Sequence, residues 1–171
     1  ADVRVLDGGL KKWIAEGRPI DGGQVTPTLG TYNARFDAAR VRRIEQMVAN
    51  LAERAEQVID ARPAPRFAGA VAEPRPGLRS GHIPGSRNLP YAELFDAATG
   101  VMKPLDQLRS AFGAAGVDLA KPIVTSCGSG VSAAVLTLAL YRLGIRDTAL
   151  YDGSWSEWGA ENGPPVVTGP A

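Results

Sequence analysis

The only cysteine of the chain, Cys127, begins the segment CGSGVS, which lies between a β-branched run and a strongly apolar stretch. In a loop that follows a strand and precedes a helix, the backbone N–H groups and the positive end of the helix dipole point toward the group that the loop encloses. For a cysteine, this favours the thiolate. Gly128 and Gly130 allow the backbone angles of a tight anion-binding loop, and Ser129 and Ser132 add hydroxyl groups. Lone cysteines are usually inert and buried, but this loop predicts a nucleophile.

Short strands and helices alternate along the part of the chain that must position Cys127. The pattern predicts a helix over residues 38–54, with Ile44, Met47, Val48 and Leu51 on one face. Further elements are expected as strands at 57–60, 122–126 and 147–151, helices at 105–115 and 132–143, and a last short helix with Trp155 and Trp158. This order predicts an α/β fold, with a central, mostly parallel sheet flanked by helices on both faces. Cys127 then lies at the carboxyl end of a strand, where such folds bind ligands.

The two ends of the chain resemble each other. The segment LDGGLKKW at residues 6–13 and the segment YDGSWSEW at residues 151–158 both contain an Asp-Gly pair, with Trp six positions after the Asp. We expect residues 1–20, with a strand at Val3–Leu6 and a helix through Ile14, to be the end of a preceding, similar domain. Residues 21–34 are rich in Gly, Pro and Thr and are expected to be a linker to a catalytic domain at 35–171.

Composition excludes several classes of protein. The chain has 19 Lys and Arg against 18 Asp and Glu, which gives no support to binding of nucleic acid or a membrane surface. No apolar run approaches the roughly 18 residues of a membrane span, and the first residues have no apolar core of a signal peptide. One cysteine cannot form an internal disulfide, so we expect a cytoplasmic protein, without metal or other cofactor.

Several segments together resemble the rhodanese superfamily and, within it, the 3-mercaptopyruvate sulfurtransferases. The CGSGVSA loop is similar to the family's CGSGVTA, and residues 151–158 are similar to its YDGSWxEW end. The other matching segments are Asp60-Ala61-Arg62, Arg66-Phe67, Glu73-Pro74-Arg75 and the GHIPG turn at 81–85. The resemblance covers residues 1–165, and the loop and the DGSW end are its most specific parts.

The resemblance implies a rhodanese-like fold and a sulfur-transfer reaction. Cys127 would take sulfur from 3-mercaptopyruvate, hold it as a persulfide and pass it to a thiol acceptor such as thioredoxin, or to cyanide. Arg66 and Arg75 would bind the carboxylate and carbonyl oxygens of the substrate, for which the planar guanidinium is suited. The substrate would also contact the loop residues Gly128, Gly130, Val131 and Ser132. Ser129 would belong to a Ser-His-Asp relay with groups of the preceding domain, because His82, the only histidine, is expected to have a packing role.

Three alternative functions stay open to different degrees. Thiosulfate-using rhodaneses resemble C-R-K-G at this loop, whose two cations suit a dianion, whereas the loop here has no charge. A cysteine phosphatase needs an arginine six places after the cysteine, where this chain has Ala133. A non-catalytic sulfur carrier or interaction module is the third alternative.

Overall fold

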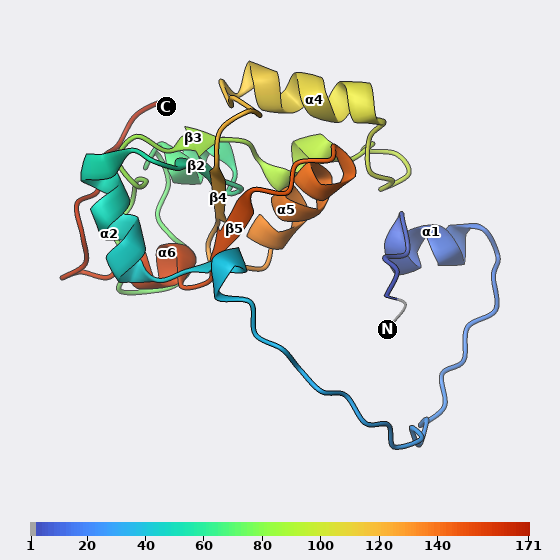
Figure 1. Ribbon diagram of the computed structural model, residues 1–171. Helices are drawn as coiled ribbons and strands as arrows, with labels where there is room; N and C mark the ends of the chain where they lie inside the picture. Colours follow the sequence, from blue (N-terminus) through green and yellow to red (C-terminus); the bar gives the residue numbers. More distant parts are fainter. Residues whose placement is uncertain (1–2) are drawn as a thin grey trace.

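The computed structural model describes residues 3–171, and its centre is a single parallel sheet. The strand order is β1-β5-β4-β2-β3, and all four pairings are parallel (Figure 1). The strands are β1 (Val41–Arg42), β2 (Gln57–Asp60), β3 (Arg87–Asn88), β4 (Ile123–Ser126) and β5 (Thr148–Tyr151). The predicted α/β class with a parallel sheet is confirmed.

The burial of β4 on both faces explains why its sequence does not alternate between apolar and polar residues. All four residues of β4 are buried, and β4 pairs with β2 and β5 on its two sides. Ile123 packs into one apolar cluster and its neighbour Val124 into another, because successive side chains of a strand point to opposite faces. A parallel strand buried on both faces has no polar side, which is why its sequence does not alternate.

Helices cover both faces of this sheet (Figure 1). Helices α4 (Leu105–Ala114) and α5 (Ala133–Arg142) pack with Ile59 and Ile123, whereas α2 (Ile44–Glu53) and α6 (Ser154–Trp158) pack with Val58 and Val124. Three one-turn segments complete the domain: η1 (Ala38–Arg40), α3 (Ala64–Phe67) and η2 (Tyr91–Leu94). In residues 3–171 no helix is long and apolar enough to cross a membrane, and the predicted compartment stays a prediction.

The helix predicted over residues 38–54 was placed too early. Val41 and Arg42 form β1, which pairs with Leu150 and Tyr151 at the edge of β5, and α2 begins only at Ile44. Residues 41–42 can form backbone hydrogen bonds with the edge of β5 only when they are extended. A helix over these residues would leave that edge without these partners. The predicted helix face is also corrected, because Met47 is buried but Val48 is 42% exposed.

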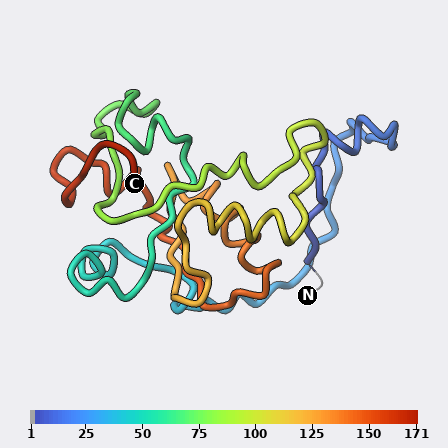
Figure 2. The backbone as a smooth tube through the Cα atoms, turned by 90° about the horizontal axis from the view of Figure 1, so that it is seen from above, coloured from blue at the N-terminus to red at the C-terminus, as the bar shows by residue number. Residues whose placement is uncertain are grey.

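The first residues described contain one helix and no strand. Helix α1 (Gly9–Ala15) forms where it was predicted, but residues 3–6 are exposed and do not form the expected strand. Residues 21–34 contain no helix or strand, and their assignment as a linker stays a prediction. Asp7 accepts a hydrogen bond from the Met102 backbone N–H at 2.9 Å, and the N-terminal segment runs beside this loop (Figures 1 and 2). The assignment of residues 1–20 to a preceding domain stays a prediction.

Candidate active site

Cys127 directly follows β4, at the carboxyl edge of the sheet. Its Sγ atom accepts a hydrogen bond from the Ser129 backbone N–H at 3.4 Å, and the residue as a whole is 1% exposed. Gly130 has φ +81°, a left-handed conformation that glycine adopts without strain. The loop thus curls back so that a backbone donor faces the sulfur, as expected of an anion-binding loop.

The first residues of α6 hold the cysteine loop in place. The Ser154 Oγ atom accepts from the Cys127 N–H at 3.2 Å, and the Trp155 N–H donates to the Cys127 carbonyl at 2.9 Å. The Ser156 N–H donates to the Gly128 carbonyl, also at 2.9 Å. Three consecutive residues of α6 therefore set the course of the backbone beside the sulfur.

A pocket of about 160 Å³ opens above Cys127. It brings together most of the residues that were singled out from the sequence. Its lining consists of Arg66, Glu73, Pro74, Arg75, Leu78, Cys127, Gly128, Ser129 and Ser132. Two predicted residues lie outside it, since Val131 is 78% exposed and Gly130 packs against Asp152.

Arg66 is held by a carboxylate that the sequence did not single out. Its Nε and Nη2 atoms donate to the Glu73 carboxylate at 3.1 Å and 2.5 Å. The hydrogen bonds with Glu73 raise the pKa of Arg66 above its usual value. Within residues 3–171, the Nη1 atom of Arg66 has no protein partner, so its hydrogens are available to a ligand in the pocket.

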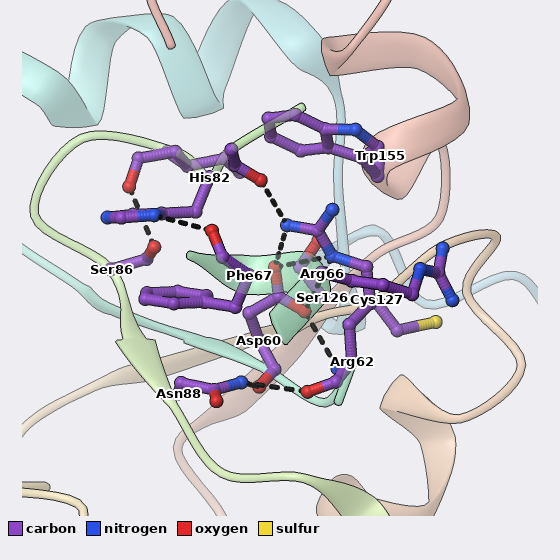
Figure 3. A network of polar contacts seen from close by, with 12 residues as sticks. Asp60, Arg62, Arg66, Phe67, His82, Ser86, Asn88, Ser126, Cys127 and Trp155 are labelled. Carbon is purple, nitrogen blue, oxygen red and sulfur yellow. Dashed lines mark hydrogen bonds and ion pairs between the residues drawn. The ribbon is translucent and has the colours of Figure 1, made fainter. Parts of the chain in front are cut away.

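Behind Arg66, a buried chain of alternating charges runs to the end of β2. Glu73 also accepts from Nη1 of Arg62 at 3.0 Å, and Arg62 makes two-pronged contacts with Asp60 at 2.6–3.1 Å. The Arg62 guanidinium also stacks over the Trp155 ring, 4.2 Å from its centroid (Figure 3). Buried charges are tolerated when each is paired and hydrogen-bonded, and this network meets both conditions.

His82 has the packing role expected of it. Its ring stacks on Phe67 with centroids 3.7 Å apart, and Nδ1 lies 2.8 Å from the Phe67 carbonyl (Figure 3). Burial lowers the pKa of His82 below its usual value of 6.5. The side chain lines no part of the pocket above Cys127, so this histidine is remote from any reaction there.

Two residues of the site carried no role in the sequence analysis. Glu73 lies in the EPR segment and Ser156 in the DGSWSEW segment, so both were inside recognised motifs. Their partners Arg66 and Arg75 are 7 and 81 residues away, and only the folded chain joins them. Residues 3–171 contain no group of three or more His, Cys, Asp or Glu that could hold a metal ion.

Comparison with known proteins gives consistent matches. Residues 44–161 match the family model of the rhodanese-like domain. The chain is 46% identical over 164 residues to 3-mercaptopyruvate sulfurtransferase of Escherichia coli K12, covering 96% of this chain and 58% of that protein. It is 40% identical over 156 residues to the human 3-mercaptopyruvate sulfurtransferase, covering 91% and 52%. It is also 40% identical over 157 residues to thiosulfate sulfurtransferase of Gallus gallus, covering 92% and 53%.

Solved structures agree with these matches. The crystal structure of SseA from Escherichia coli superposes with a TM-score of 0.76 at 42% identity, covering 88% of this chain and 55% of that one. The Tum1 protein of Saccharomyces cerevisiae gives a TM-score of 0.82 at 29% identity, covering 95% and 59%. The chain thus spans a little more than half the length of these relatives.

Proposed function

Because this chain belongs to the rhodanese family, we propose that it carries the sulfur-accepting site of an enzyme that uses 3-mercaptopyruvate. One observation carries the proposal: Cys127, Arg66 and Arg75 line the same pocket, and the loop between the sulfur and the pocket mouth has no charged side chain. Relatives named 3-mercaptopyruvate sulfurtransferase, at 40–46% identity, support the choice of substrate.

In the proposed reaction, the Cys127 thiolate attacks the sulfur of 3-mercaptopyruvate. The bond between that sulfur and carbon 3 breaks, and its electron pair stays on the carbon as the enolate of pyruvate. A proton from solvent completes pyruvate, and the sulfur remains on Cys127 as a persulfide. An acceptor thiolate then attacks the outer sulfur and restores the Cys127 thiolate.

Arg66 and Arg75 would act both in substrate binding and in stabilisation of the enolate. Guanidinium groups bind a carboxylate in the ground state and stabilise the negative charge that develops on the carbonyl oxygen of the enolate. Arg66 has its Nη1 hydrogens free toward the pocket among the described residues, and Glu73 prevents it from turning away. The Ser129 N–H donates a hydrogen bond to Sγ of Cys127, the atom that attacks the substrate and then carries the transferred sulfur.

Thiosulfate is the second candidate donor. The relative from Gallus gallus, named thiosulfate sulfurtransferase, has the same identity to this chain as the human 3-mercaptopyruvate enzyme. A dianion, however, is best bound by fixed cations next to the sulfur, and the CGSGVS loop offers none. We therefore favour the monoanionic mercapto-acid.

We further propose two partners: a thiol acceptor such as thioredoxin, and a preceding rhodanese-like domain to which residues 1–20 belong. Support for the second comes from apolar side chains that have no cover in this structure. Leu6, Leu10 and Ile14 of the N-terminal segment are 52–62% exposed. The preceding domain would also supply the histidine and aspartate of a relay with Ser129, which lines the pocket.

Mass spectrometry of the intact protein tests the proposed reaction. After incubation with 3-mercaptopyruvate, we expect one added sulfur atom on Cys127 and an equivalent of pyruvate, and neither product in Cys127→Ser. The experiment is done on this chain and on the chain joined to a preceding rhodanese-like domain. If no sulfur is added in either form, the proposed reaction is wrong. If thiosulfate loads Cys127 and 3-mercaptopyruvate does not, the substrate is wrong.

A further inference from the structure

Ser156 connects the cysteine loop to Arg75 at the rim of the pocket. Its Oγ atom donates to the Gly128 carbonyl at 2.6 Å, and Nη1 of Arg75 donates to the same Oγ atom. We propose that Ser156 is a positioning residue, which holds Arg75 in place for a carboxylate-bearing ligand of Cys127. This inference deepens the proposed function and rests on it for the identity of the natural ligand.

The directions of both hydrogen bonds follow from chemistry. A hydroxyl has one hydrogen to donate and two lone pairs, and a guanidinium can only donate. Arg75 must therefore be the donor to Ser156, and the single Ser156 hydrogen is left for the Gly128 carbonyl. A cationic donor at one end and a carbonyl acceptor at the other polarise the hydroxyl in the same sense, so the two bonds strengthen each other.

The same contact orients the donor to the sulfur. The Gly128 carbonyl and the Ser129 N–H belong to one trans peptide, so they point in opposite directions. Both the N–H and the Oγ of Ser156 bind that carbonyl, on the side of α6. The Ser129 N–H is thereby turned to the other side, where it donates to Sγ of Cys127 at 3.4 Å.

Arg75 depends on Ser156 more than Arg66 does on any single partner. Arg66 is clamped by two bonds to the buried Glu73 carboxylate. Arg75 is exposed, and in the described part of the chain its side chain has Ser156 as its hydrogen-bond partner and no ion pair. Without the Ser156 hydroxyl, an exposed arginine samples many rotamers, and a ligand must then order it on binding.

Alkylation of Cys127 measures this positioning without the transfer reaction. Iodoacetate carries a carboxylate and iodoacetamide is its neutral counterpart, so the ratio of their rates reports carboxylate binding beside the sulfur. Cys127 is the only cysteine, so the mass of the intact chain gives each rate without ambiguity. We expect Ser156→Ala to lower the iodoacetate-to-iodoacetamide ratio about fivefold, the effect of one hydrogen bond of ordinary net strength.

Two variants serve as matched controls. Ser156→Thr keeps the hydroxyl and is expected to keep the ratio. Ser110→Ala makes the same change as Ser156→Ala at an exposed position of α4, away from the pocket, and should leave the ratio unchanged. An unchanged ratio in Ser156→Ala, or an equal loss in Ser110→Ala, contradicts the inference.

If Ser156→Ala fails to fold, Arg75→Gln tests the same hydrogen bond by changing its exposed partner. The ratio should fall at least as far as in Ser156→Ala, and adding Ser156→Ala to Arg75→Gln should change it no further, because the two residues act through one contact. A ratio unaffected by Arg75→Gln overturns the inference. A persulfide test that fails while these ratios change as expected removes the proposed substrate and leaves the role of Ser156 intact.

Discussion

At the scale of single residues, the two arginines of the pocket are held in different ways. Arg66 is fixed by a buried carboxylate, and Arg75 by an uncharged hydroxyl. An ion pair with one buried partner is hard to break, whereas a hydrogen bond at the surface exchanges readily with water. Arg66 is therefore part of the rigid wall of the site, and Arg75 is the more adjustable of the two.

Glu73→Gln is predicted to destabilise the protein and to weaken donor binding. The Glu73 side chain is 2% exposed and pairs with both Arg62 and Arg66, so the neutral amide leaves buried positive charge uncompensated. We expect a loss of about 3 kcal/mol in the free energy of unfolding, measured in urea, and a raised KM for 3-mercaptopyruvate. Glu93→Gln, at an exposed position, is the matched control and should change neither. Equal stability of the two variants would contradict the role given to Glu73.

At the scale of elements, the cysteine loop takes its shape from α6 and from one left-handed glycine. A Cβ atom on Gly130 would lie 3.1 Å from both the backbone carbonyl and the Oδ1 of Asp152, in a conformation with φ +81°. Gly113 in α4 is the opposite case, because it is helical and a Cβ atom there meets nothing within 4 Å. Glycine is therefore required by the backbone conformation at position 130 but not at position 113.

Gly130→Ala is predicted to lower the free energy of unfolding by about 2 kcal/mol, from backbone strain and the approach to Asp152. Gly113→Ala should raise it by roughly 0.5–1 kcal/mol, since alanine stabilises a helix interior. Urea unfolding of both variants measures the difference. Two changes of the same sign and size would show that the loop does not need the left-handed residue.

The element boundaries illustrate what local pattern can and cannot decide. The apolar run at residues 132–143 predicted α5 almost to the residue, because the buried face of that helix, Ala133, Leu136, Ala139 and Leu140, lies within one continuous stretch of sequence. The pattern at 38–54 suggested a helix from the start, yet residues 41–42 pair with β5. The competing partner is more than 100 residues away along the chain, so no local signal reports it.

At the scale of the whole molecule, residues 3–34 contribute little to the folded domain. Most of this segment is exposed, and Asp7 makes its hydrogen bond to the domain through Met102. We predict that Asp7→Ala lowers the free energy of unfolding, measured in urea, by about 1 kcal/mol, the net value of one hydrogen bond. An unchanged stability would contradict the contribution given to this contact.

His82 is predicted to make the stability fall as the pH drops below 6.5, the ordinary pKa of a histidine. Its pKa is lowered in the folded state by burial, so the unfolded chain binds the proton more tightly. The stabilisation from keeping this ring neutral is complete above the ordinary value of 6.5 and is lost as pH falls toward the lower, folded pKa. The free energy of unfolding should therefore decrease from pH 7.5 to pH 5.5.

His82→Gln is the control, because it removes the only histidine of the chain. This variant should be less stable at pH 7.5, through loss of the stack on Phe67, but nearly flat from pH 7.5 to pH 5.5. Glu16 and Asp96, whose carboxyl pKa values are lowered by hydrogen bonds, titrate below this window. The same slope in the variant and the parent protein would exclude His82 as its source.

The sequence by itself determined the fold class, the nucleophile and the substrate-binding arginines as predictions. Those inferences depend on short-range features: apolar runs that end in Gly-rich loops, and motifs that keep their spacing. Only the tertiary structure decided which groups hold those side chains, namely Glu73 behind Arg66, Ser156 behind Arg75 and α6 behind the cysteine loop. The physical reason is that parallel strands bring their carboxyl ends to one edge, so residues 60, 127 and 152 become neighbours although the chain separates them widely. The contacts made at that edge depend on three-dimensional packing, which sequence spacing does not encode.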